Sequence, residues 1–339
     1  MPDFPSFRFS TAPMLDWTDR HCRRFWRIMT KRSLLYTEMV TSGAIIYGKN
    51  DYLAFDEAEH PVAVQLAGCD PKDLAVCAKR AEEKGYDEIN LNCGCPSDRV
   101  QNGGFGAALM LRPDLVADIV KAMTDAVSVP VTVKCRIGID NEDSPDFLRN
   151  FVRKVSAAGC RRFIIHARKA WLEGLSPSEN RSVPPLIYER VHMIKREFPD
   201  LMVVINGGLS DLGTCLEELR ELDGVMVGRA AWENPAMLLE VDERIFGAER
   251  NTMSRADVVR EYLGYIEKEL SLGVKLTALV KPMLGIFHSC PGGKLFRKAV
   301  SEEAWKKGAG AEVVEKALME QKKAEEAFLE YRSRLPQGD

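Results

Sequence analysis

The stretch PVAVQLAGCDPKDLAVCAKRAEEKGYDEINLN (61–92) decides the fold. It begins with a short apolar run at 61–66, continues with an amphipathic segment at 71–85 that starts at a proline and ends at a glycine, and closes with a second apolar run at 87–92. Short apolar runs of this kind indicate strands that are buried on both faces, whereas the middle segment has the period of a helix. A strand, a helix and another strand in this order predict a right-handed unit of a parallel sheet.

The same alternation continues along most of the chain. The other apolar runs lie at 7–14, 33–40, 129–135, 161–167, 201–207 and 223–228, and the other amphipathic segments lie at 112–126, 145–159 and 211–222. Together they give eight strand candidates before residue 230, which match an α/β fold, the closed (β/α)8 TIM barrel. A doubly wound open sheet is the alternative.

After about residue 245 the apolar runs stop and only the helical period remains. Ser254 is placed to cap a helix, with Asp257 three residues later, and Gly308 and Gly310 precede a last helical segment at 311–335. We therefore predict two domains. Residues 1–245 form a catalytic (β/α)8 barrel, and residues 246–339 form an all-helical domain.

The composition is that of an ordinary globular protein that works in the cytoplasm. Hydrophobic residues make up 45% and charged residues 29% of the 339 residues. No apolar run approaches the roughly 18 residues that a membrane span needs, and the first residues lack the features of a signal peptide. The nine cysteines form no disulfide framework, which suits a reducing compartment.

Charge gives no global indication of nucleic acid, because the net charge is −3. Basic clusters at 20–27, 160–163, 166–169 and 292–298 are local candidates for contacts with phosphates. Runs of this kind are usually solvated faces of the surface, which is the plainer interpretation for each of them.

The residues that close the predicted strands are the first place to look for chemistry, because catalytic groups of a barrel gather at the carboxyl ends of its strands. These positions carry Ala12, Pro13, Met14, Glu38, Gln65, Asn90, Asn92, Cys95, Lys134, Arg136, His166, Arg168, Asn206, Gly207, Gly208, Gly228 and Arg229. A single polar strand end can simply belong to a solvated loop. So many polar or glycine ends at once indicate a site.

Two glycine turns predict a phosphate site. The motifs NGGLSD (206–211) and VGRAAW (227–232) each place backbone N–H groups and a helix start after a late strand, where a barrel often holds phosphate. Tight turns without a ligand are the alternative. The expected grip consists of Gly207, Gly208, Gly228 and Arg229.

The phosphate is best explained by flavin mononucleotide (FMN). Nucleotide fingerprints fail elsewhere, because the Gly104–Gly106 turn lacks the third glycine and Gly293-Lys294 lacks both the upstream glycine and the following Ser or Thr. A reduced flavin needs a positive charge near its pyrimidine edge and amide donors that orient the ring, roles that suit Lys134 and Gln65. Lys134 can alternatively extend from its strand end to solvent.

The motif NCGCPSDRVQNGGFGAALM (92–110) carries the reactive group. Two cysteines one residue apart do not make a zinc site, which wants four ligands, so we expect no metal. The GCP segment fixes Cys95 in a turn after the fourth strand. An ordinary thiol is largely protonated near neutral pH, which favours Cys95 as a general acid. Cys93 fits a small buried side chain better.

Several motifs of this chain occur together in one known family. They are APMLDWTD (12–19), VQLAG (64–68), INLNCGCPSDRVQNGGFGAALM (89–110), VTVKCRIGID (131–140), HARKAWLEGLSPSENR (166–181), VINGG (204–208) and VGRAAWENP (227–235). In this combination the chain resembles the tRNA-dihydrouridine synthases over residues 8–335. The long segment that starts at His166 resembles the A-type bacterial subgroup in particular.

The resemblance implies an FMN-bound barrel with a C-terminal helical domain that binds tRNA. It implies NADPH-driven reduction of uridine in the D-loop of tRNA, at positions 20 and 20a, with Cys95 as the proton donor to C5 and hydride from FMN to C6. It also implies that the two glycine turns hold FMN together with Gln65, Lys134 and His166. The segment FHSCPGGKLFRKAVSE (287–302) departs from the more arginine-rich pattern of relatives, which weakens residue-level expectations for tRNA contacts there.

The remaining expectations complete the site. Ala12, Pro13, Met14 and Asn206 are expected at the cofactor; Asn92, Arg168, Lys169, Arg297 and Lys298 are expected at the substrate or tRNA. We expect a monomer. One rival is an FMN barrel that reduces free pyrimidines or other small unsaturated substrates, although these need no helical appendage. The other is an RNA-binding scaffold that has lost its chemistry.

Overall fold

The computed structural model describes residues 4–97 and 103–334. These residues form two compact units. The first contains the described residues up to Arg20 together with Arg32–Gly228, and the second contains His21–Lys31 together with the described residues from Arg229 onward. The sequence prediction assigns 21–31 and 229–245 to the barrel domain, whereas their contacts group them with the C-terminal helices.

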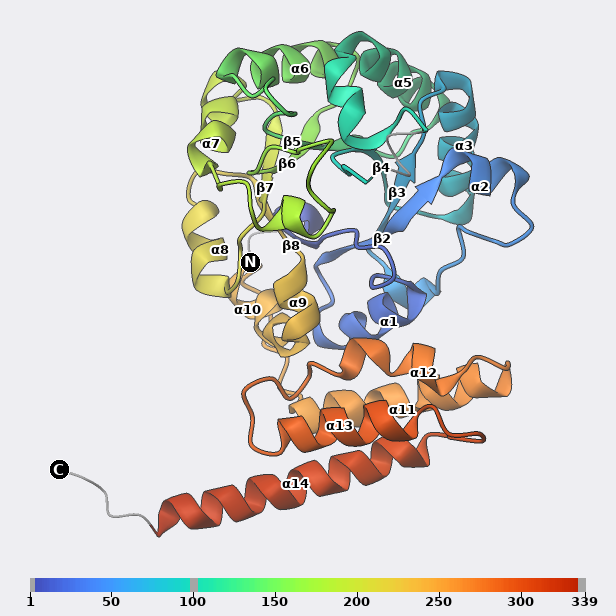
Figure 1. Ribbon diagram of the computed structural model, residues 1–339, viewed down its shortest axis with the longest axis vertical. Helices are drawn as coiled ribbons and strands as arrows, with labels where there is room; N and C mark the ends of the chain where they lie inside the picture. Colours follow the sequence, from blue (N-terminus) through green and yellow to red (C-terminus); the bar gives the residue numbers. More distant parts are fainter. Residues whose placement is uncertain (1–3, 98–102, 335–339) are drawn as a thin grey trace, which may run out of the picture. The chain divides into compact units, whose positions relative to one another are not determined.

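The first unit is built on a closed barrel of eight parallel strands (Figure 1). Each strand pairs with the next along the chain and the last pairs with the first, so the predicted (β/α)8 barrel is confirmed and the open sheet is wrong. The strands are β1 (Phe9–Thr11), β2 (Leu34–Thr41), β3 (Val62–Ala67), β4 (Glu88–Cys93), β5 (Val131–Arg136), β6 (Arg162–His166), β7 (Met202–Asn206) and β8 (Gly224–Val227). Every predicted strand segment overlaps one of them, and β2, β3, β4 and β5 each end one residue later than predicted.

Helices surround the strands of this unit, as the sequence predicts (Figure 1). The helices are α2 (Ser42–Tyr47), α3 (Pro71–Lys84), α5 (Pro113–Ala126), α6 (Pro145–Ala157), α7 (Tyr188–Glu197) and α8 (Leu212–Glu218), with short 3₁₀ helices η1 (Ser6–Arg8), η2 (Glu57–Glu59), η3 (Gly106–Leu111) and η4 (Glu179–Arg181). Asp70, Ser144 and Asp211 accept backbone N–H groups at the starts of α3, α6 and α8. These caps satisfy amides that have no partner inside the helix.

An apolar cluster fills part of the barrel interior. Side chains from several strands pack there, including Tyr36, Ala63, Ile164, Val204 and Met226. Because residues alternate across a strand, the neighbours two positions further along point into the same interior towards the carboxyl ends. Those neighbours include the polar strand ends that the sequence singles out.

The second unit is helical. Its elements are α1 (Arg20–Met29), α9 (Arg229–Glu233), η5 (Pro235–Glu240), α10 (Val241–Arg244), α11 (Arg255–Ser271), α12 (Leu276–Leu279), η6 (Lys281–Met283), α13 (Gly293–Glu303) and α14 (Glu312–Ser333). The predicted cap is confirmed, because Ser254 and Asp257 form a reciprocal capping box at the start of α11. No helix in the described ranges is both long and apolar enough to cross a membrane.

Helix α1 corrects one expectation from the sequence. The basic cluster at 20–27 is not simply a solvated face, because Arg23 is only 3% and Arg27 only 8% exposed. The apolar residues between them explain this burial: the Phe25 ring packs edge-on against Tyr262 of α11, with ring centroids 5.0 Å apart. Arg27 compensates by donating to the carbonyl oxygen of Thr30 at 2.8 Å.

Candidate active site

The Cys95 turn follows β4 directly and is held from two sides. The side-chain oxygen of Asn92 accepts hydrogen bonds from the backbone N–H groups of Gly94 and Cys95, each at 3.0 Å. The carbonyl oxygen of Cys95 accepts from the N–H of Ala107 in η3 at 2.9 Å. The half-buried thiol lies 3.5 Å from the hydroxyl of Ser97. Residues 98–102 of the motif lie outside the described ranges.

Cys93 differs from Cys95 in its burial. It is fully buried at the end of β4, beside Cys135 of β5. Burial, and then the neighbouring thiols, raise the pKa of Cys93 well above its usual value, and burial raises the pKa of Cys135 to about 12. A buried thiol with a raised pKa is inert, so Cys95 is the accessible member of the pair.

Lys134 brings a positive group to the carboxyl ends of the strands. It lies on β5, half-buried, and its Nζ donates to the side-chain oxygen of Asn206 at 3.0 Å. Asn206 in turn donates to the carbonyl oxygen of Met226 at 2.8 Å, which fixes which side of its amide faces the lysine. Burial first, and then the charge of Arg136, lower the pKa of Lys134 to about 8. An anion bound beside this amine would stabilise its charged form and raise its pKa.

Gln65 and Asn92 are brought together on adjacent strands. Gln65 is buried on β3 and donates from its amide nitrogen to the oxygen of Asn90 at 2.8 Å. Its oxygen accepts from the amide nitrogen of Asn92 at 2.7 Å. The sequence predicts that Asn92 orients a uracil; in the structure its amide also links Gln65 to the Cys95 turn.

The turn after β7 requires glycine. Gly207 has a φ of 106° and Gly208 a φ of 75°, which side-chain-bearing residues rarely adopt. A Cβ on Gly207 would lie 2.4 Å from Cδ2 of His166, and a Cβ on Gly208 would lie 2.4 Å from Cδ1 of Leu186. The hydroxyl of Tyr188 donates to the carbonyl of Gly207 at 2.7 Å. His166 itself is buried at the end of β6, in register with Asn206.

The ends of β1 and β8 meet at the other predicted cofactor residues. The N–H of Ala12 donates to the carbonyl of Val227 at 2.8 Å. A Cβ on Gly228 would lie 3.5 Å from Cβ of Ala12 and 3.6 Å from Sδ of Met14, which is ordinary contact. Pro13 is half-buried between them. This part of the mouth is therefore lined by small and apolar side chains.

Arg168 and Lys169 belong to a long segment after β6 that is held in place locally. The guanidinium of Arg168 donates to the carbonyl of Pro184. The Nζ of Lys169 donates to the carbonyl of Asp140 at 3.0 Å and to Oδ2 of Asp143 at 2.9 Å, and it lies 4.2 Å above the Trp171 ring. These contacts order the segment from the β5 side.

Arg136 joins this segment to the Cys95 turn. Its Nε donates to the carbonyl of Gly94 at 3.1 Å, while its NH1 group donates to the carbonyls of Asn180 at 2.9 Å and Lys169 at 3.3 Å. Burial lowers the pKa of Arg136 to about 10. The sequence places Arg136 at a strand end but gives it no role, because its partners are backbone carbonyls that no side-chain pattern reveals.

The carboxyl ends of the barrel strands are thus polar, and the turn after β4 carries a thiol. Residues 10–323 match the family described as dihydrouridine synthase. The chain belongs to this family. The family is flavin-dependent, which makes the protein a flavin-dependent oxidoreductase.

Individual relatives agree with the family assignment. The chain is 60% identical over 315 residues to a tRNA-dihydrouridine(20/20a) synthase of Salmonella typhi, and the matched region covers 93% of this chain and 95% of that protein. It is 58% identical over 314 residues to the protein of the same name from Vibrio cholerae, and the matched region covers 92% of this chain and 96% of that protein. The relative from Escherichia coli K12 is 59% identical over 314 residues, covering 92% and 91%.

A distant solved structure supports the fold alone. The complex of 2-naphthoyl-CoA reductase with 2-naphthoyl-CoA is similar to this chain with a TM-score of 0.54 and 11% sequence identity. The similarity covers 70% of this chain and 50% of that one. This family member therefore spans about half the length of the reductase.

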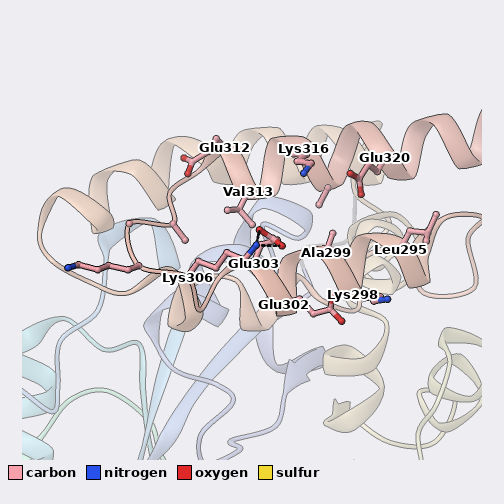
Figure 2. A pocket seen from close by; sticks show the side chains of 14 residues that line it. Leu295, Lys298, Ala299, Glu302, Glu303, Lys306, Glu312, Val313, Lys316 and Glu320 are labelled. Carbon is pink, nitrogen blue, oxygen red and sulfur yellow. Dashed lines mark hydrogen bonds and ion pairs between the residues drawn. The ribbon is translucent and has the colours of Figure 1, made fainter.

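The predicted residues of the second unit lie on its helices. Arg229 begins α9, and the exposed Arg297 on α13 donates from Nε to the carbonyl of Leu284 at 3.3 Å. Lys298 lines a groove between α13 and α14, which Figure 2 shows from close by. The groove carries lysines and glutamates in equal number: Lys298, Lys306, Lys307, Lys316, Glu302, Glu303, Glu312 and Glu320. Its local charge is balanced. Lys306 and Glu303 form an ion pair at 2.6 Å, drawn as a dashed line in Figure 2.

Within the described ranges of this family member, no three His, Cys, Asp or Glu side chains gather as a metal centre requires.

Proposed function

We propose that the chain reduces uridine to dihydrouridine at positions 20 and 20a of the tRNA D-loop, the positions in the names of its bacterial relatives. The proposal takes FMN as the bound flavin and NADPH as the reductant. The observation that carries it is the Cys95 turn: the thiol stands at the carboxyl end of β4, two residues beyond the strand, where Asn92 holds its backbone.

The residues at the mouth fit a flavin. Gly207 and Gly208 leave backbone where any Cβ would collide with His166 or Leu186, and such a cradle suits a phosphate. Gly228 and Arg229 would complete the phosphate grip in the turn after β8. Lys134, with its pKa lowered to about 8, would meet the pyrimidine edge of the ring, where negative charge develops on reduction. When bound, reduced FMN supplies the hydride that adds to C6 of the uracil ring.

The residues of the chain supply the proton and the binding surface. The thiol of Cys95 holds a proton on Sγ and delivers it to C5, which balances the hydride at C6 and leaves the C5–C6 bond saturated. Asn92 and Gln65 keep the turn and the pocket wall in place, and Asn92 orients the uracil edge. His166 and Arg168 line the pocket or bind phosphate. Ala12, Pro13, Met14 and Asn206 would line the bound flavin.

We assign tRNA binding to the helical domain, with Arg297 and Lys298 as contacts to the phosphate backbone, and we add Lys169 of the barrel domain as a further contact. The target base must leave its loop to reach a barrel mouth, as in other enzymes that act on a base. Since the substrate is tRNA, we place the enzyme in the cytoplasm. That it acts as a monomer stays a prediction.

The test is mass spectrometry of tRNA from cells that lack this protein and from the same cells after re-expression. We expect uridines 20 and 20a to gain two hydrogens only on re-expression. Purified flavoprotein with NADPH is the second arm. Reduction of free uracil or orotate at rates comparable to those on unmodified tRNA would favour the small-substrate rival, and a colourless protein with full tRNA affinity would favour a scaffold.

A further inference from the structure

The barrel interior holds a charged group that the proposed chemistry does not use. Glu88, the first residue of β4, is buried and forms an ion pair with Arg162 of β6. Its Oε1 also accepts hydrogen bonds from the hydroxyls of Tyr36 and Thr132, the latter at 2.6 Å. A carboxylate that faces an arginine only accepts hydrogen bonds, so both hydroxyls must be donors here.

A chain of side-chain hydrogen bonds leads from Thr132 towards the carboxyl end of β4. Because the proton of Thr132 points to Glu88, its oxygen accepts from the amide nitrogen of Asn90 at 2.9 Å. The oxygen of Asn90 accepts from the amide nitrogen of Gln65 at 2.8 Å, and the oxygen of Gln65 accepts from the amide nitrogen of Asn92 at 2.7 Å. Every link donates in the direction of Glu88.

The chain ends at the Cys95 turn. With its nitrogen on Gln65, Asn92 presents its oxygen to the backbone N–H groups of Gly94 and Cys95, each at 3.0 Å. The two ends require the same direction, because backbone N–H groups only donate and Glu88 only accepts. A reversed chain would turn the NH₂ group of Asn92 towards those N–H groups, and the turn would lose both hydrogen bonds.

We propose that Glu88 is a positioning residue for Cys95. Its carboxylate fixes the direction of the chain, and the chain holds the oxygen of Asn92 against the turn that carries the thiol. In a low-dielectric interior such a network is strong when every member is satisfied and costly when one link is misdirected. The catalytic consequence rests on the proposed function, in which Cys95 is the proton donor, whereas the effect on the turn does not.

The sharpest test compares two variants that each remove one hydroxyl donor from the same oxygen of Glu88. Thr132→Val breaks the chain, whereas Tyr36→Phe removes a donor that is not one of its links. Both changes nearly preserve the shape of the side chain. Flavin content and thermal unfolding of both purified proteins establish that they are folded.

We expect Thr132→Val to change the rate at which iodoacetamide alkylates Cys95, followed on the Cys95 peptide, by about fivefold or more. We also expect kcat on unmodified tRNA to fall about tenfold with little change in KM, since the lost contact positions the proton donor and does not bind tRNA. Tyr36→Phe should stay within about twofold of the wild type in both measurements. Wild-type alkylation and kcat in Thr132→Val would overturn the proposal, as would equal losses in Tyr36→Phe.

Glu88→Gln is a third variant with its own signature. The oxygen of the new amide should face the guanidinium of Arg162, and its nitrogen should face Thr132. This nitrogen would donate towards Thr132, which opposes the direction of donation that the Cys95 turn requires. We expect Cys95 alkylation to change as in Thr132→Val, provided that the variant folds; if it does not fold, Thr132→Val decides alone.

Failure of the proposed function looks different from failure of this proposal. A Cys95→Ala protein with full turnover would remove Cys95 from the chemistry. The alkylation rates of the Thr132→Val and Tyr36→Phe proteins would still report whether the chain holds the turn.

Discussion

At the scale of single residues, Lys134 shows most directly that the carboxyl ends of the barrel strands suit an anion. Its amine is held against Asn206 in a half-buried position, and burial together with Arg136 lowers its pKa to about 8. The charged form is therefore less favourable in the folded protein than in the unfolded chain. The residue therefore costs stability that a bound anion can return.

This cost predicts a pH dependence in the flavin-free protein. A lysine whose folded pKa lies below its unfolded value destabilises the fold below the folded pKa, and this penalty is lost as pH rises from about 8 towards 10.5. Relative to Lys134→Met, the free energy of unfolding of the wild type should rise over this window by at most about 3 kcal/mol. Denaturant titrations at a series of pH values measure it.

The exposed Lys121, which pairs with Asp125, offers the matched control. Lys121→Met should give a curve parallel to that of the wild type, because the Lys121 side chain is exposed to solvent in the folded protein. Parallel curves for Lys134→Met and the wild type would show that Lys134 is fully solvated and would remove the electrostatic argument for the flavin.

Residue types could be predicted at this scale, but their partners could not. The strand-end rule identifies Gln65, Asn92, Cys95 and Lys134, because side-chain chemistry is visible in the sequence. It does not identify Glu88 as part of the same network, since its link to Cys95 passes through residues of three strands that are distant in the chain. Long-range hydrogen bonds leave no periodic signal.

At the scale of elements, the segment between β6 and α7 depends on one buried amide. Asn180 is fully buried; its nitrogen donates to the carbonyls of Trp171 at 2.9 Å and Leu175 at 3.2 Å, and its oxygen accepts from the N–H of Trp171 at 2.8 Å. The segment has no helical or strand period, so the sequence predicts its place in the chain but not its internal order. Arg136 then fastens the carbonyl of Asn180 to the barrel.

We expect Asn180→Ala to loosen this segment, because three backbone groups lose their partner while the barrel strands keep theirs. Limited proteolysis should cleave between residues 168 and 187 several times faster than in the wild type, and KM for tRNA should rise. Ser178→Ala, at an exposed position two residues away, is the control and should behave as the wild type. Unchanged cleavage in Asn180→Ala would show that other contacts order the segment.

At the scale of the whole molecule, α1 packs with helices that are distant from it in the sequence. It follows β1 in the chain, yet its residues from His21 onward belong to the helical unit. Tyr262 of α11 donates to the carbonyl of His21 at 3.1 Å, and the hydroxyl of Tyr265 lies 2.8 Å from Nδ1 of the same histidine. Periodicity predicts elements and their order well, whereas the partner that buries an amphipathic face is set by tertiary packing.

A chain that ends at residue 245, the predicted domain boundary, should therefore leave α1 uncovered. Amide hydrogen exchange in residues 21–29 should be fast in this fragment, since Tyr262 and Tyr265 are lost. A chain that ends at Ala309 keeps α11 and loses α14, so α1 should remain protected there. Equal protection of α1 in the two shortened chains and in the full-length protein would contradict this assignment.

The central claim is that Cys95 donates the proton that completes dihydrouridine, and one measurement tests it most directly. Anaerobically reduced flavoprotein is mixed with unmodified tRNA, and dihydrouridine formation is followed in a single turnover for the wild type, Cys95→Ala and Cys93→Ala, the last being a buried thiol two residues away. We expect all three to keep their flavin and its reduction by NADPH, and only Cys95→Ala to lose about a hundredfold or more in rate. A Cys95→Ala protein that forms dihydrouridine at the wild-type rate would contradict the account.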